Sequence, residues 1–194
     1  MTVSLEDIYT QITNITSIKE LQEEPLKIST SLKLMGKGGL NATLTFPLNQ
    51  KQSTFYFSGR LGPTKFIYFD TAIFPALGLK VLEGDLQELT FEASANETAS
   101  TGKMTMKYSG LKAQVFKQDS EEVNDFLSWT ANTALHRSNP EKNGKVREVV
   151  LNYDREPYKG LGSYIWKTLQ SGITNTISPF GKKIKKTKGD KKKN

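Results

Sequence analysis

The chain has 194 residues, of which 36% are hydrophobic and 24% charged, a composition typical of a globular protein rather than a fibrous or membrane-spanning one. It has no cysteine and a single histidine, His136, which excludes a disulfide framework, a thiolate zinc site, a His-His metal pair and a cysteine nucleophile. Sequence motifs for a serine nucleophile elbow, a phosphate-binding loop and a zinc protease helix are also missing. We therefore expect no catalytic residue, no metal and no cofactor.

The net charge of +7 comes from one short segment at the C-terminus. Residues 182–194 contain eight lysines and one aspartate, which leaves 19 basic and 19 acidic side chains in the first 181 residues. The body of the protein is electrically balanced, and residues 182–194 are predicted to form a disordered lysine-rich tail.

Residues 1–25 are predicted to form an N-terminal helical segment. Ser4 and Asp7 have the spacing of a helix cap, and Pro25 closes the region. Apolar residues recur between them at helical spacing, namely Leu5, Ile8, Ile12 and Ile15.

From residue 26 the apolar period changes to two, which is typical of half-buried strands. Glycines at 36, 38 and 39 interrupt the alternation and predict a β-hairpin, in preference to a phosphate cradle, because strands flank them on both sides. Further strands are expected near 55–57 and 66–69 and on both sides of a turn at 96–102. At Gly110 the alternation slips by one residue, which predicts a β-bulge.

Amphipathic helices are expected at 120–135 and 162–178, with one more strand between them at 149–153. Residues 26–181 then form one α+β domain with a curved, mostly antiparallel, groove-like sheet. His136 follows the first of these helices, and we expect it to cap carbonyl groups rather than to bind an anion.

The apolar side of such a sheet must be covered by something. Periodicity alone favours the protein's own helices, which would make a closed scaffold domain that docks to another protein. The alternative is a face left open as a groove for acyl chains, where flexible, polarizable methionines suit the ligand. Either way, the alternation places these side chains on the apolar side: Leu40, Leu44, Phe46, Leu89, Phe91, Met104, Met106, Val149, Leu151 and Tyr153.

The last helix and the lysine tail have the composition of an element that lies on an anionic membrane. Candidate contact residues are Tyr164, Trp166, Lys182, Lys183, Lys185, Lys186 and Lys188. A solvated tail on a packed helix is the alternative. The lysines could also neutralise nucleic-acid phosphates, but with four arginines in the chain and no interleaved aromatics we expect no specific nucleic-acid binding.

Several segments resemble the C-terminal region of AsmA-like proteins of the Bacteroidetes type. The resemblance covers about residues 26–178 and is most specific over 100–173. It rests on STGKMTMKYSGLKAQVF at 100–116, Ala131-Asn-Thr, Ser138-Asn-Pro with Gly144-Lys-Val-Arg147, Tyr153-Asp-Arg155-Glu-Pro157 and Trp166-Lys-Thr-Leu-Gln-Ser-Gly172-Ile, and on Phe55-Tyr-Phe-Ser-Gly59-Arg-Leu-Gly62 upstream.

The resemblance implies a non-enzymatic module of the cell envelope. Family members carry an N-terminal membrane helix and build an elongated β-groove on the periplasmic side, linked to outer-membrane biogenesis and phospholipid movement. This chain shows neither that helix nor a signal peptide. The expected partners are a phospholipid or other acyl lipid, an anionic membrane surface and another envelope protein, and the open groove becomes the favoured interpretation. Arg147 and Arg155 are expected to be structural and to pair with Glu148, Asp154 or Glu156.

Overall fold

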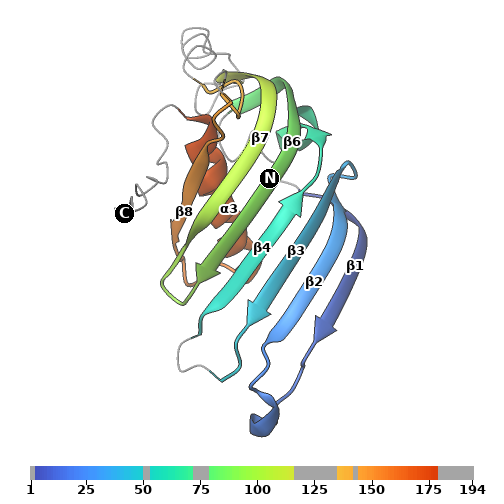
Figure 1. Cartoon of the computed structure of the whole chain (residues 1–194), viewed down its shortest axis with the longest axis vertical. Helices are drawn as coiled ribbons and strands as arrows, with labels where there is room; N and C mark the ends of the chain where they lie inside the picture. Colours follow the sequence, from blue (N-terminus) through green and yellow to red (C-terminus); the bar gives the residue numbers. More distant parts are fainter. Residues whose placement is uncertain (1–2, 50–52, 72–78, 116–134, 142–143, 179–194) are drawn as a thin grey trace, which may run out of the picture.

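The protein is described from a computed structural model, which covers residues 3–49, 53–71, 79–115, 135–141 and 144–178. These residues form one open antiparallel sheet and one α-helix, with two short 3-10 helices (Figure 1). In chain order the elements are β1 (Leu5–Thr13), η1 (Lys19–Leu21), β2 (Leu26–Leu34), β3 (Gly38–Phe46), β4 (Phe55–Leu61), β5 (Thr64–Lys65), η2 (Phe66–Phe69), β6 (Leu79–Ala95), β7 (Ala99–Val115), β8 (Glu148–Asp154) and α3 (Leu161–Ile177).

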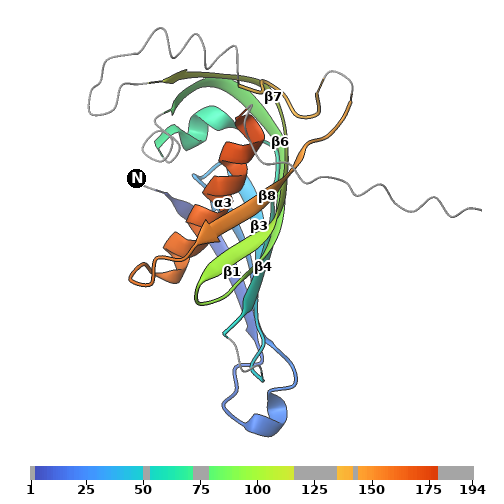
Figure 2. The same ribbon diagram turned by 90° about the vertical axis from the view of Figure 1, so that its left-hand side faces the viewer.

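The strands follow one another across the sheet in the order β1-β2-β3-β4-β6-β7-β8, and the two-residue strand β5 pairs with β6. Every neighbouring pair is antiparallel. The sheet curves strongly, and α3 lies in its hollow against β7 and β8 (Figure 2). Strands β1 to β3 extend beyond the helix at the far side of the sheet (Figure 1).

The alternation in the sequence predicted the central strands correctly. The β2–β3 hairpin turns at Met35 and Gly36, which both have positive φ angles. At the predicted bulge, Glu83 faces Lys112 and Asp85 faces Ser109, so β7 carries one extra residue beside Gly110. The last helix was also predicted within one residue at each end.

Two predictions about elements are wrong. Residues 5–13 form the edge strand β1 rather than a helix, and Phe66–Phe69 is a 3-10 helix rather than a strand. In η2, Phe66 and Phe69 are buried while Ile67 and Tyr68 are exposed, a spacing of three that extended backbone cannot produce. The predicted helix at 120–135 and the lysine tail lie outside the described residues, apart from Leu135.

The core lies between α3 and the curved part of the sheet. Aromatic rings fill much of it, with Phe55 stacked on Phe46 and Phe57 and in edge contact with Tyr164. Among the described residues, no helix combines the length and the apolar character that crossing a membrane requires.

Close packing of α3 depends on Gly172. A Cβ atom at this position would lie 2.3 Å from Leu151 Cδ2 and 2.8 Å from Met104 Sδ, both beneath the helix on the sheet. A glycine that weakens the helix locally is therefore what allows the helix axis to approach β7 and β8.

We expect Gly172→Ala to destabilise the protein by about 1–3 kcal/mol, because the added methyl group overpacks this contact. The matched control is Gly162→Ala in the same helix, where an added Cβ meets no atom within 4 Å. The control should be neutral or slightly stabilising, since alanine favours helix over glycine by about 1 kcal/mol. Urea unfolding of the two variants measures the difference, and equal stability would contradict this packing.

Candidate functional site

The main surface feature is the apolar face of the sheet, which we define as the face carrying the inward-alternating residues of all seven long strands. Cross-strand pairing lines these residues up in rows. One row crosses the whole sheet and consists of Ile12, Ile28, Leu44, Phe57, Ala93, Gly102 and Leu151. The apolar face is therefore continuous from β1 to β8.

Burial along this row is high on β4, β6 and β8 and low at the β1 edge. Leu151 on β8 is fully buried and Phe57 on β4 nearly so, whereas Ile28 is partly exposed and Ile12 is 48% exposed. Leu5 and Ile8, also on β1, are 49% and 58% exposed. We call the part of the apolar face on β1, β2 and β3 the open half, because α3 packs on β7 and β8. Its fully exposed part is β1, since Leu32 on β2 is buried and the other apolar residues of β2 and β3 are partly buried.

Polar contacts along α3 attach the helix to the covered half. Its residues Tyr164, Thr168, Gly172 and Thr176, one turn apart, are buried against the sheet. Thr168 Oγ1 lies 2.6 Å from the Ser100 hydroxyl on β7. Together with the bonds of Ser171 and Asn175 to β8, this contact fixes the position of the helix over β7 and β8.

Two further side chains of α3 form hydrogen bonds with the backbone of the edge strand β8. Ser171 Oγ accepts a hydrogen bond from the backbone N–H of Asn152, and the Asn175 side chain donates to the carbonyl of Val150. Side chains of α3 thus occupy backbone groups that an edge strand normally offers to another strand.

The predicted apolar stripe of α3 is not the side that packs most tightly. Ile165, Leu169 and Ile173 are partly buried at the margin of the core, and Leu161 is exposed. The helix therefore buries a row of small and polar residues against the sheet and leaves part of its aliphatic surface beside the open half.

A cavity of about 80 Å³ lies at the boundary between the covered and the open half. All of its lining residues are apolar: Val3, Leu34, Met35, Leu61, Phe66, Phe69, Leu86, Leu89, Met106, Trp166 and Ile173. A cavity of ~150 Å³ holds one benzene molecule, so this one has room for a few carbon atoms.

The ten residues predicted to line a groove all lie on the apolar face. Six of them are buried, namely Leu89, Phe91, Met104, Met106, Val149 and Leu151, and four are partly exposed, namely Leu40, Leu44, Phe46 and Tyr153. Of the buried six, Leu89 and Met106 reach the cavity.

The structure places the membrane-contact candidates of α3 differently from the prediction. Tyr164 is buried against Phe55, Tyr153 and Arg155, so its ring has no surface to offer a membrane. Trp166 lines the apolar cavity. The candidate lysines 182, 183, 185, 186 and 188 lie outside the described residues.

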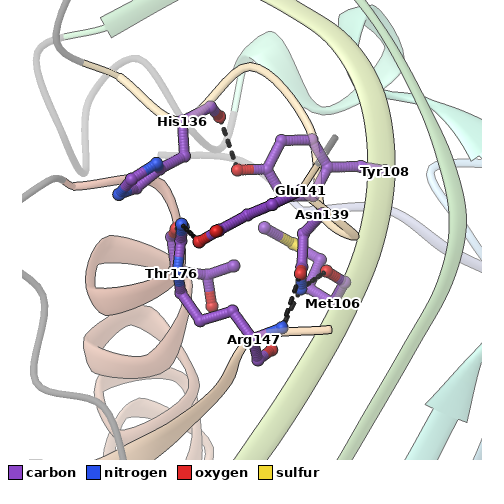
Figure 3. Close-up of polar contacts among 7 residues, drawn as sticks. All are labelled: Met106, Tyr108, His136, Asn139, Glu141, Arg147 and Thr176. Carbon is purple, nitrogen blue, oxygen red and sulfur yellow. Dashed lines mark hydrogen bonds and ion pairs between the residues drawn. The ribbon is translucent and has the colours of Figure 1, made fainter. Parts of the chain in front are cut away.

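A buried polar cluster connects the loop at residues 135–147 to the sheet and to the end of α3 (Figure 3). Asn139 is fully buried, and its side chain bonds the carbonyl groups of Met106 and Arg147 and the N–H of Arg147. Arg147 in turn donates to the Thr176 carbonyl at 2.6 Å and to Glu141 at 2.7 Å. The cluster is structural: a guanidinium group at a helix C-terminus satisfies carbonyl groups that the helix itself leaves unpaired.

This geometry corrects the expected partner of Arg147, which is Glu141 rather than Glu148. Arg155 lies over the ring of Tyr164, with its Cζ atom 5.4 Å from the ring centre. The backbone N–H of His136 donates to the carbonyl of Ile177 at the end of α3. The helix that His136 was expected to cap, at 120–135, lies outside the described residues apart from Leu135.

The opposite face of the sheet is polar and carries cross-strand ion pairs. Glu83, Glu88 and Glu92 on β6 each pair with a lysine on β7, and Arg60 also reaches Glu88. Hydrogen bonds from Lys107 and Arg60 lower the pKa of Glu88. No group of three or more acidic or histidine side chains suited to a metal ion occurs within the described ranges.

Sequence reasoning missed the most exposed apolar residues of the site, which are those of β1. The sequence does contain a signal for a strand here, since Ile8 and Ile12 are β-branched and an even number of residues apart.

No family model matches the chain, and comparison with curated proteins and with solved structures finds no match either. The resemblance to AsmA-like proteins therefore stays a prediction.

Tyr108 gives a test of the polar cluster through pH. Its hydroxyl donates to the His136 carbonyl, and burial raises its pKa above the ordinary value of 10.0. Below about pH 10 the hydroxyl stabilises the folded state fully, and above it the unfolded chain ionises first, so this stability is lost.

We therefore expect Tyr108→Phe to cost about 1 kcal/mol at neutral pH through the lost hydrogen bond. The difference in unfolding free energy between this variant and the native chain should decrease as the pH rises past about 10. Urea unfolding of both proteins at several pH values provides the measurement, and a gap that stays constant with pH would argue against a buried, protonated phenol.

Proposed function

We propose that the chain is a non-catalytic lipid-handling module that keeps acyl chains of phospholipid away from water on its apolar face. The observation that carries this proposal is the burial gradient along one cross-strand row, which is fully covered at Leu151 and half exposed at Ile12. Contiguous exposed apolar surface of this kind is typical of a binding site rather than of ordinary protein surface.

The mechanism is hydrophobic shielding, in which no bond is made or broken. Each methylene group taken from water is worth about 0.8 kcal/mol when fully covered. A chain lying on the open half is covered by protein on one side, so it gains roughly half of that per methylene group. Such contacts are not directional, which allows a chain to move along the face.

The cavity beside Trp166 and Met106 gives the open half a defined end. Its walls are entirely apolar, so the terminal carbons of an acyl chain are better suited to it than a headgroup. The polar headgroup would remain at the rim of the sheet, in water.

The resemblance to AsmA-like proteins supplies the cellular setting of the proposal. The chain would act in the cell envelope, on the periplasmic side, as the C-terminal module of a protein of outer-membrane biogenesis. The lysine tail at 182–194 would touch an anionic membrane surface, where each lysine is worth about 1 kcal/mol.

The direct test measures uptake of a fluorescent phospholipid by two charge variants of strand β2. Ile28 lies on the apolar face and Ser29 on the opposite face, so Ile28→Glu and Ser29→Glu add the same charge on opposite sides of one strand. We expect at least a tenfold loss of affinity for Ile28→Glu, which corresponds to about 1.4 kcal/mol, and unchanged affinity for Ser29→Glu.

Circular dichroism of both variants checks that they fold. Purified native protein should also carry phospholipid that mass spectrometry of its organic extract identifies. Equal affinity of both variants, or no lipid uptake by the native chain, would remove the lipid from the proposal and favour the alternative of a scaffold domain that docks to another envelope protein.

The tail makes a separate prediction about membranes. Sedimentation with vesicles containing anionic lipid should be strong at low salt, weak at high salt, and lost when residues 182–194 are removed. Equal binding to neutral vesicles would contradict an electrostatic role for the tail.

A further inference from the structure

The two edge strands of the sheet, β8 and β1, differ in whether other parts of the protein bond to their outer backbone groups. At β8, side chains of α3 occupy the backbone groups of Asn152 and Val150. At β1, all nine residues are exposed, and in the described part of the chain β2 is the one strand that pairs with it. One edge is sealed and the other is available.

Edge strands are normally protected from further pairing by lysine, proline, inward-pointing charges or a bulge. Strand β1 has a bulge between Glu6 and Tyr9, but beyond it the strand carries none of the other protecting features. From Ile8 to Ile18 the chain has no charged residue and no proline. The charged residues Glu6 and Asp7 lie at the bulge that precedes this run, and Asp7 is already paired with Lys33 at 2.7 Å.

We propose that β1 is a self-association edge, at which a second copy of this chain adds its own β1 antiparallel about a two-fold axis at Thr10. In this register Ile8 lies opposite Ile12 of the second copy, and Thr10 lies opposite itself. Residues of the same parity then share a face, so the apolar faces of the two copies join into one.

In this register the directly paired segment, Ile8–Ile12, contains no charged residue. Glu6 and Asp7 lie outside that segment, at the bulge of β1, so neither carboxylate is set against an aliphatic side chain of the second copy.

Because the chain contains no cysteine, one substitution tests the axis. In Thr10→Cys, the two new thiols face each other and should form a disulfide-linked dimer under mild oxidation. The matched control is Thr30→Cys, the neighbour of Thr10 on β2. Across the axis, two copies of residue 30 are three strand spacings of about 4.8 Å apart, beyond the roughly 7 Å that a disulfide can bridge.

A dimer of the Thr10 variant and a monomer of the Thr30 variant are the expected result. A monomeric Thr10 variant, or equal cross-linking of both, would overturn the proposal, because the thiols would then meet by random collision or not at all.

Charge swapping tests the register without a covalent link. Tyr9 and Gln11 lie on the polar face and oppose each other across the axis. Tyr9→Lys with Gln11→Lys should make the chain sediment as a monomer, because like charges then face each other. Tyr9→Lys with Gln11→Glu should restore the dimer, because each lysine then faces a glutamate.

Native protein that sediments as a monomer across the micromolar range would refute the proposal, as would a double-lysine variant that dimerises like the native chain. The substitutions at Tyr9 and Gln11 lie on the polar face and leave the apolar face unchanged, so lipid uptake should persist in both of these charge variants. Loss of the dimer with normal lipid uptake bears on the self-association proposal alone. A normal dimer without lipid uptake bears on the lipid proposal alone.

Discussion

The structure depends on how the apolar side chains on one face of the antiparallel sheet are covered. Seven long strands contribute to that face, and within the described residues one helix and a short 3-10 turn cover its β4–β8 side. The hydrophobic effect favours closing the remainder, because the isoleucine and leucine side chains of β1 are otherwise in contact with water. The uncovered strands are thus the part of the molecule where a ligand or partner gains most.

The position of the helix explains why the cover stops where it does. Gly172 brings α3 close to β7 and β8, and Thr168, Ser171 and Asn175 bond it there. Arg147 donates a hydrogen bond to the Thr176 carbonyl in the last turn of α3. Directional bonds along its length therefore hold the helix over β7 and β8, away from the β1 side of the sheet.

Much of the sheet could be predicted from the sequence because alternation is a local signal. The strands flanking Gly36 and the slip at Gly110 needed no tertiary information. The N-terminal error has a physical cause: the bulge between Glu6 and Tyr9 brings Leu5 and Ile8 onto one face of a strand, which reproduces helical spacing. The partner of Arg147 could not be predicted, because Glu141 meets it only after the loop folds back onto β7. The same holds for the exposed state of the open half, since no local pattern states which half of a face a helix will cover.

The sealed edge at β8 has a consequence for the size of any assembly. A sheet with two available edges can add strands at both and grow into a fibre. Here the side chains of Ser171 and Asn175 occupy backbone groups of β8, so an assembly built through β1 would stop when two β1 edges meet. In that assembly the helix that shelters the core would also limit the number of copies to two.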